Sequence, residues 1–197
     1  MTKLTNELRA LYRSRWDSCI PSKPTLVASA WGTIFSLRKV YDDLSTLTGG
    51  KVPWHVLGVL HMMERACSLK HHLHNGDPLT ARTVHVPAGR PLDGKPPFSW
   101  LQSAEDAVRV QGLHLWADWS LSGTLYQIES WNGTGYLRWH SDVPSPYLWA
   151  GSNIYTSGKY TADGKWDQAA VSKQIGAAVL LKHGQDLGDV VFSGTDA

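Results

Sequence analysis

The stretch that most constrains the fold of this chain is Val52–Asp77, VPWHVLGVLHMMERACSLKHHLHNGD. Pro53 suits the first turn of a helix, where its missing N–H costs no hydrogen bond. Apolar residues then recur with helical spacing, at Val56, Val59, Leu60, Met63 and Cys67. The pattern predicts a buried helix over about 53–67, followed by a polar, histidine-rich loop.

One carboxylate, Glu64, falls on the apolar stripe of this helix. At about 100° per residue it lies between Leu57 and Leu60, inside the apolar arc. His55 and Arg65 are expected on the opposite side. Burial of a charge is costly, and desolvation raises the pKa of a carboxyl group. Glu64 is therefore either a general acid for work near neutral pH or a structural partner of an arginine or a backbone N–H.

The rest of the chain predicts further helices and little strand. Thr5 is a plausible N-cap for the first helix. We expect helices over about 5–16, 25–47, 99–115, 121–131 and 167–182. Between the central helix and the next one, His71–Phe98 is rich in Pro and Gly, and Arg82–Val86 is its one strand-like segment.

These elements predict a mostly α (α+β) fold over a single domain, residues 1–197. We expect a small β-hairpin or extended lip within 71–98, an irregular aromatic segment over 133–164, and a loosely held tail after about residue 184.

Composition argues against some classes of function, such as nucleic-acid binding. The net charge of +2 gives no basic surface of the kind that binds nucleic acid. No apolar run reaches the roughly 18 residues of a membrane span, and no signal-peptide pattern opens the chain, so we expect synthesis in the cytoplasm. Of the two cysteines, Cys67 is expected to be a buried free thiol. The 10 Trp and 7 Tyr suit a core and equally suit stacking on sugar rings.

Several segments resemble the lysozyme superfamily, which includes goose-type and phage lysozymes and lytic transglycosylases. Pro53–Glu64 resembles the catalytic helix, in which the acid Glu lies near the C-terminal end. Trp131-Asn132-Gly133-Thr134-Gly135-Tyr136 is similar to the Tyr-Asn-Gly-x-Gly-Tyr segment that lines the sugar cleft. The segments at 72–80, 145–149 and 158–160, in that order, look like those of lysozyme-family proteins of phages and bacteria.

This resemblance implies a lysozyme-like domain that cleaves the bond between N-acetylmuramic acid and N-acetylglucosamine in peptidoglycan, as a phage-type endolysin does after release to the wall. Glu64 is the implied acid and Asp77 the candidate second carboxylate, although Asp77 also suits a turn. Glu129 is a reserve candidate whose helix-end position favours a solvated role. The implied contacts to peptidoglycan glycan strands are His74, Asn75, Thr80, Trp131, Asn132, Tyr136, Tyr147, Trp149 and Tyr155. We expect no cofactor, no metal and a monomer.

Two other functions remain open at this stage. His71, His72, His74 and His85 with Asp77 would suit a zinc-dependent peptidoglycan amidase or peptidase. A non-catalytic wall-binding or phage structural protein would keep the aromatic residues and leave Glu64 without a role. Within the glycosidase hypothesis, hydrolysis and lytic transglycosylation both remain open.

Overall fold

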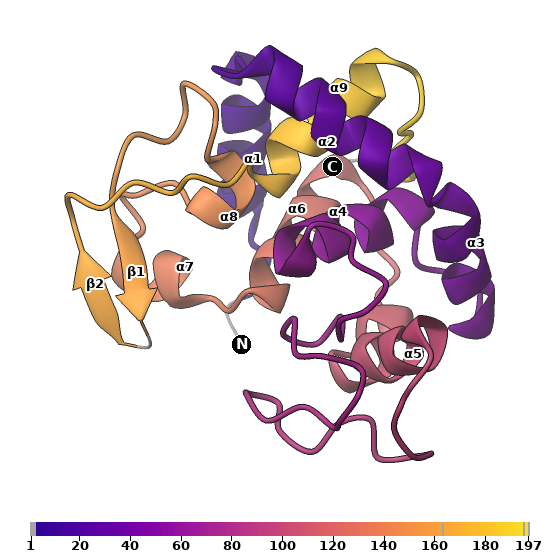
Figure 1. Cartoon of the computed structure of the whole chain (residues 1–197). Helices are drawn as coiled ribbons and strands as arrows, with labels where there is room; N and C mark the ends of the chain where they lie inside the picture. The colour runs from indigo at the N-terminus through magenta and orange to yellow at the C-terminus, as the bar shows by residue number, and fades with distance from the viewer. Residues whose placement is uncertain (1–2, 163, 195, 197) are drawn as a thin grey trace. The chain divides into compact units, whose positions relative to one another are not determined.

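The computed structural model describes residues 3–162, 164–194 and 196. Within that part of the chain it contains nine α-helices, a short 3₁₀ helix and one two-stranded antiparallel sheet, which confirms the mostly α (α+β) fold class. Contacts divide the chain into two compact units: Met1–Trp31 with Asp118–Ala197, and Gly32–Ala117. Helix α2 (Pro24–Ser36), labelled in Figure 1, contains the boundary between the two units, which lies between Trp31 and Gly32.

The first unit combines the start of the chain with its C-terminal half. Its elements are α1 (Asn6–Ser18), the start of α2 (Pro24–Ser36), α6 (Leu121–Trp131), α7 (Gly135–Trp139), α8 (Pro146–Trp149), β1 (Lys159–Ala162), β2 (Lys165–Asp167) and α9 (Ala177–Asp186). The Thr5 side chain accepts the Leu8 N–H at 3.3 Å, so the predicted N-cap is confirmed. Helix α6 has the bounds that the sequence predicts. Large fully buried side chains of this unit are Tyr12, Trp31, Leu125, Ile128 and Trp149.

The second unit holds the predicted central helix. Its elements are the end of α2, α3 (Arg38–Leu47), α4 (Trp54–Arg65), α5 (Trp100–Val110) and the 3₁₀ helix η1 (Leu113–Leu115). Helix α3 packs on both α4 and α5. Large fully buried side chains of this unit are Ile34, Tyr41, Leu44, Leu57, Leu60, Leu73 and Leu113. The apolar positions predicted for the central helix are all buried.

The predicted long helix over 25–47 is wrong, because the chain forms two helices that meet at Leu37. The Ser36 hydroxyl donates to the Thr33 carbonyl at 2.7 Å, and the Leu37 N–H bonds the Ile34 carbonyl, three residues back. Such short-range bonds compete with the regular α-helical pattern and bend or end a helix. Leu37 therefore becomes the N-cap of α3, with φ −102° and ψ 11°.

The strand expected at Arg82–Val86 is absent from the described structure, and the hairpin forms at 159–167 instead. Prolines follow at 87, 91, 96 and 97, and proline cannot donate to a strand ladder. The N–H groups of Val84 and His85 bond the Asp77 carboxylate, not a neighbouring strand. In the observed hairpin, Tyr160 pairs with Trp166.

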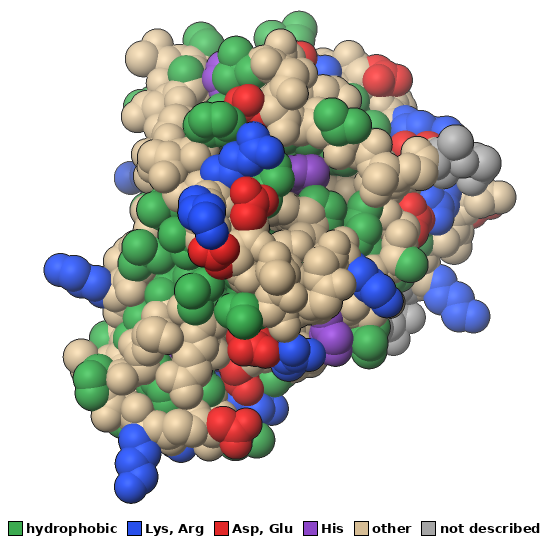
Figure 2. Space-filling view, turned by 90° about the vertical axis from the view of Figure 1, so that its right-hand side faces the viewer, with side chains coloured by type: hydrophobic (Ala, Val, Ile, Leu, Met, Phe, Trp, Pro, Cys, Tyr) green, Lys and Arg blue, Asp and Glu red, His purple; other side chains and the backbone are tan. Residues whose placement is uncertain are grey.

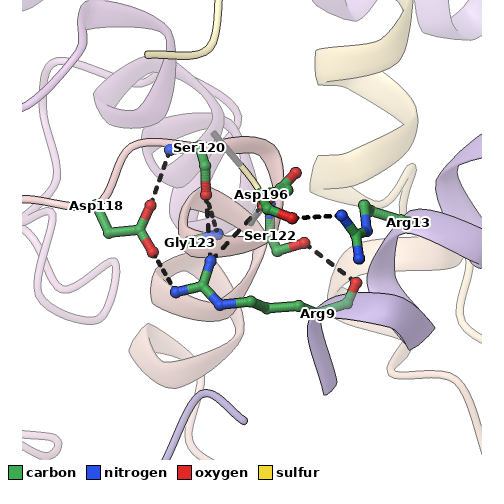
Figure 3. Close-up of polar contacts among 7 residues, drawn as sticks. All are labelled: Arg9, Arg13, Asp118, Ser120, Ser122, Gly123 and Asp196. Carbon is green, nitrogen blue, oxygen red and sulfur yellow. Dashed lines mark hydrogen bonds and ion pairs between the residues drawn. The ribbon is translucent and has the colours of Figure 1, made fainter. Parts of the chain in front are cut away.

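The last helix begins at Ala177, ten residues later than predicted, and continues to Asp186. The expected loose tail after residue 184 is also wrong for the residues described there. Asp189 accepts a bond from the Trp31 indole at 2.9 Å, and Val190 is buried. Further along, Arg9 pairs with Asp118 at 2.6 Å and with Asp196 at 3.7 Å (Figure 3). The C-terminal segment is thus bound to α2 through Trp31 and to α1 through Arg9.

The described surface carries charges of both signs. Ion pairs at i,i+4 spacing join Arg38 to Asp42, Lys39 to Asp43 and Glu105 to Arg109. On the face that Figure 2 displays, positive and negative side chains lie interspersed. In the part of the chain that the structure describes, no helix has both the length and the apolar character needed to cross a membrane.

Candidate functional site

Helix α4 is buried almost all round and ends just after the predicted acid. His55 is buried, so its predicted place on the exposed side is wrong, whereas Arg65 is exposed as expected. Glu64 is half-buried. Because most of its residues are buried, α4 is a central core element and not an amphipathic surface helix.

The turn after Glu64 has an unusual backbone. Ala66 and Cys67 have φ of 47° and 59°, and among the described residues they are the non-glycine residues with positive φ. The Ala66 N–H bonds the Met62 carbonyl and the Cys67 N–H bonds the His61 carbonyl, which ends the helix in the manner usually reserved for glycine. Each such residue costs of order 1 kcal/mol and persists where its surroundings hold it. Here the buried Cys67 side chain, whose Sγ lies 3.4 Å from the Tyr41 hydroxyl, keeps the backbone in this conformation.

The loop that carries Asp77 returns to this helix end. The Gly76 N–H bonds the His72 carbonyl, and the His72 N–H bonds the Asp77 carbonyl, which closes a tight turn. Gly76 has φ 77°, and a Cβ there would lie 3.2 Å from the Glu64 carbonyl oxygen. Glycine is needed at this position for both its conformation and its close approach. The fold therefore packs the residue beside Asp77 directly on the backbone of Glu64.

Asp77 is held by donors from the 84–85 segment. One carboxylate oxygen accepts the N–H groups of Val84 (2.8 Å) and His85 (3.0 Å), and the other accepts the His85 ring Nδ1 (2.6 Å). Burial by itself raises the pKa of Asp77, but these bonds together outweigh burial and lower the pKa to about 2. Asp77 is thus ionised at neutral pH and also holds the loop in place. Its position in a turn therefore does not prevent it from being a charged carboxylate.

The predicted sugar contacts near Asp77 differ in accessibility. Asn75 is half-buried and braces the loop: its amide donates to the His85 carbonyl, and its oxygen accepts the Asp77 N–H. Thr80 is exposed. The His74 side chain is buried and bonds Asp106 at 2.8 Å, a position that favours a structural role.

The histidines proposed for a zinc site have separate partners. The rings bond as follows: His71 to Ser68, His72 to Ser103 and the Ala81 carbonyl, His74 to Asp106, and His85 to Asp77. Across the described residues, no group of three or more His, Cys, Asp or Glu side chains is arranged to hold a metal ion. The arrangement therefore gives no support to the zinc alternative.

The first unit has an aromatic groove, here defined as the cavity of about 520 Å³ formed by the end of α6, α7, α8, β1 and the 172–174 segment. Its lining residues are Asn132, Gly133, Gly135, Tyr136, Trp139, Pro146, Tyr147, Lys159, Tyr160, Ala162, Gly164, Ser172 and Gln174. Aromatic faces with a few amide, hydroxyl and ammonium groups are suited to binding sugar rings.

The aromatic groove includes three of the six contacts predicted in this part of the chain, Asn132, Tyr136 and Tyr147. The other three, Trp131, Trp149 and Tyr155, lie outside the groove lining among the described residues. All three are buried, and so are Tyr136 and Tyr147, which are 6% and 7% exposed. Trp149 is 0% exposed, so we assign it to the core.

Other groove residues were missed by the sequence reasoning. Trp139 lines the aromatic groove and is 75% exposed, which is unusual for so large an apolar side chain. Tyr160 contributes a wall from β1, in edge contact with Tyr136 (5.5 Å) and with Trp166 (5.2 Å), and Trp166 stacks on His140 at 3.5 Å. An Asp-Gly pair at 163–164 is the sequence signal for this hairpin.

Glu129 is not the solvated helix-end residue that its position predicts. It is 2% exposed, and the Tyr12 hydroxyl donates to its Oε2 at 2.5 Å. Burial raises the pKa of Glu129 to about 7, although the Tyr12 bond and the Arg15 charge act in the opposite direction. The packing of α1 on α6 causes this burial, because Tyr12 and Arg15 are both on α1.

Glu129 makes stability depend on pH. Its folded pKa of about 7 lies above the ordinary 4.5, so the stabilisation is fully present below pH 4.5 and is lost as the pH rises through 7. We expect the loss to be about 3 kcal/mol. Glu129→Gln should remove this dependence. The free energy of unfolding of the variant, minus that of the wild type, should therefore be larger at pH 8 than at pH 5. Urea unfolding of both proteins at the two pH values measures the difference, and identical pH profiles would contradict the burial argument.

Comparisons of the chain with protein-family models, with curated proteins and with solved structures find no match.

Proposed function

We propose that this chain is a peptidoglycan glycosidase, a muramidase-like enzyme in which Glu64 is the general acid. The observation that carries the proposal is the contact of Gly76 with the Glu64 backbone, which brings the segment of the ionised Asp77 to the end of the acid's helix. Glycoside cleavage needs one protonated carboxyl group and, in most families, one ionised carboxylate. The turn at Ala66 and Cys67 adds support, because strained backbone conformations cluster at functional sites.

In hydrolysis, Glu64 donates its proton to the glycosidic oxygen as the bond to C1 of N-acetylmuramic acid breaks. Asp77 either takes a proton from the water that adds to C1, or only stabilises the positive charge on the sugar while the ionised Glu64 takes that proton. In transglycosylation, the 6-hydroxyl of the same sugar attacks C1 and gives a 1,6-anhydro product. The ionised Glu64 takes the hydroxyl proton, so no second carboxylate is required. The aromatic groove of the first unit would bind glycan chiefly on the exposed ring of Trp139, with the largely buried Tyr136 and Tyr147 in its lining.

Mass spectrometry of fragments released from purified peptidoglycan tests this proposal. Muropeptides with reducing-end muramic acid indicate hydrolysis and 1,6-anhydro ends indicate transglycosylation, and we expect either product to form equally with and without a chelator. Chelator-sensitive release of peptides would contradict the proposal in favour of a zinc enzyme. No release at all would contradict it in favour of a binding or structural protein.

Asp77→Asn should distinguish hydrolysis by two carboxylates from transglycosylation by Glu64 alone. The amide oxygen of Asn can still accept the N–H groups of Val84 and His85, so the loop should keep its conformation while the charge is lost. We expect glycan release to fall about 100-fold or more for two-carboxylate hydrolysis. Release near the wild-type rate would instead assign the chemistry to Glu64 alone, as in transglycosylation.

His85→Ala is the matched control for Asp77→Asn. It removes the ring donor to Asp77 but keeps the carboxylate and both backbone donors. If His85→Ala and Asp77→Asn lower the rate equally, the effect comes from the loop and not from the Asp77 charge.

A further inference from the structure

A second cavity in the first unit has the character of a binding site. Its volume is about 280 Å³, and it lies among α1, the end of α6, α7 and the 141–143 segment. Its apolar walls are Leu8, Leu11, Leu137 and Val143. We call it the Glu129 cavity. It is smaller than most pockets for drug-sized molecules and has the volume for a single aliphatic side chain.

The charged groups of the Glu129 cavity differ in how deeply they are buried. Glu129 is buried, Arg15 is half-buried, and Lys3 and Glu7 are exposed. The cavity thus has a carboxyl group at its inner end, apolar walls, and two cations and one carboxylate toward solvent. A ligand that complements this order has an amine at its tip, an aliphatic chain, and a carboxylate or carbonyl group at its outer end.

The Glu129 cavity also adjoins the aromatic groove. Tyr136 lines both, and its hydroxyl accepts the Tyr160 N–H at 3.4 Å. A polymer in the aromatic groove could therefore place a side branch in the Glu129 cavity, on the other side of a single tyrosine. Peptidoglycan is a branched polymer of this kind, because its glycan carries peptides that contain a diamino acid.

We propose that the Glu129 cavity binds the aliphatic amine side chain of the diamino acid in the wall peptide. This inference rests on the proposed function for the identity of the polymer. The ammonium group donates to the Glu129 carboxylate at the inner end, and the peptide backbone lies near Arg15 and Lys3. No bond is made or broken, and the cavity acts to select glycan that carries its peptide.

The titration of Glu129 sets the expected pH dependence of binding. The ionisable groups that interact with it are Tyr12 and Arg15 on α1 and Tyr136 on α7, and Lys3 and Glu7 also line the cavity. With its pKa at about 7, Glu129 is mostly neutral at pH 6 and mostly ionised at pH 8. An ammonium ligand favours the ionised form, so binding should strengthen between these pH values.

The test uses two probes that differ only at the tip, Nα-acetyl-L-lysine and Nα-acetyl-L-norleucine, titrated into the full chain at pH 8 and followed by NMR. A charge-assisted hydrogen bond in a desolvated site predicts at least about tenfold tighter binding of the lysine probe. We expect this preference to disappear in Glu129→Gln and to persist in Glu105→Gln. Glu105 is the matched control because it carries the same substitution on α5, outside the lining of the Glu129 cavity.

Equal affinity for the two probes, no binding of either, or a preference that survives in Glu129→Gln would each overturn the inference. Urea unfolding at pH 8 shows whether Glu129→Gln is folded, and the variant is expected to be at least as stable as the wild type there. The probes contain no sugar, so the two proposals can fail separately. Glycan release without probe preference rejects the amine site alone, whereas probe preference without glycan release supports an amine site and rejects the glycosidase.

Discussion

Glu64→Gln is expected to lower the rate of glycan release by about 1,000-fold or more, with a change of less than about 1 kcal/mol in the free energy of unfolding. The amide has the size of the carboxyl group but cannot donate a proton to the leaving oxygen. Glu64 is half-buried at the end of α4, so the substitution leaves the core of the helix intact. Release of reducing ends from peptidoglycan and urea unfolding measure the two quantities.

Glu105→Gln is a matched control for Glu64→Gln. Glu105 lies in the same unit on α5, where it pairs with Arg109 at 2.9 Å. An ion pair on a helix surface contributes only about 0.3–0.5 kcal/mol, so the variant should differ little from the wild type in both rate and stability. If Glu64→Gln releases glycan as fast as Glu105→Gln does, Glu64 has no part in the chemistry.

The helices that the sequence predicts well are those with local signals at their ends. Thr5 caps α1, and Asn132-Gly133 follows α6 where the apolar pattern stops. The break at Leu37 has no such signal, because neither proline nor glycine marks it. The start of α9 after its N-cap, Gly176, shows the opposite problem, because a helical signal is present where no helix forms. Apolar residues recur at helical spacing before Gly176, although the chain there is not helical.

The candidate sites show the limit of sequence reasoning more clearly. The position of Glu129 near a helix end indicates solvent exposure, but Tyr12, 117 residues away, covers it. Trp139 and Trp149 lie in equally aromatic surroundings along the chain, yet one is 75% exposed and the other is fully buried. Residue type and spacing identify an aromatic segment, but only tertiary packing decides which ring faces the groove.

Gly176→Ala is expected to destabilise the protein by about 2 kcal/mol or more. A Cβ at this position would lie 2.2 Å from the Leu148 carbonyl oxygen and 2.6 Å from the Trp149 nitrogen. Both are backbone atoms of α8 that cannot rotate away, and the Gly176 N–H already bonds the Ala150 carbonyl at 2.8 Å. The φ of −69° is one that alanine adopts readily, so the effect measures the contact and not the backbone conformation. Urea unfolding provides the measurement.

Gly32→Ala is the control that makes this result interpretable. Gly32 is an exposed position inside α2 with no atom within 4 Å of an added Cβ, so alanine should stabilise by about 0.5–1 kcal/mol. The same methyl group thus has opposite effects at the two glycines. Because α8 supplies Pro146 and Tyr147 to the aromatic groove, a displaced α8 in Gly176→Ala should also weaken glycan binding. If Gly176→Ala is as stable as Gly32→Ala, the close contact of α9 with α8 does not hold that wall of the groove in place.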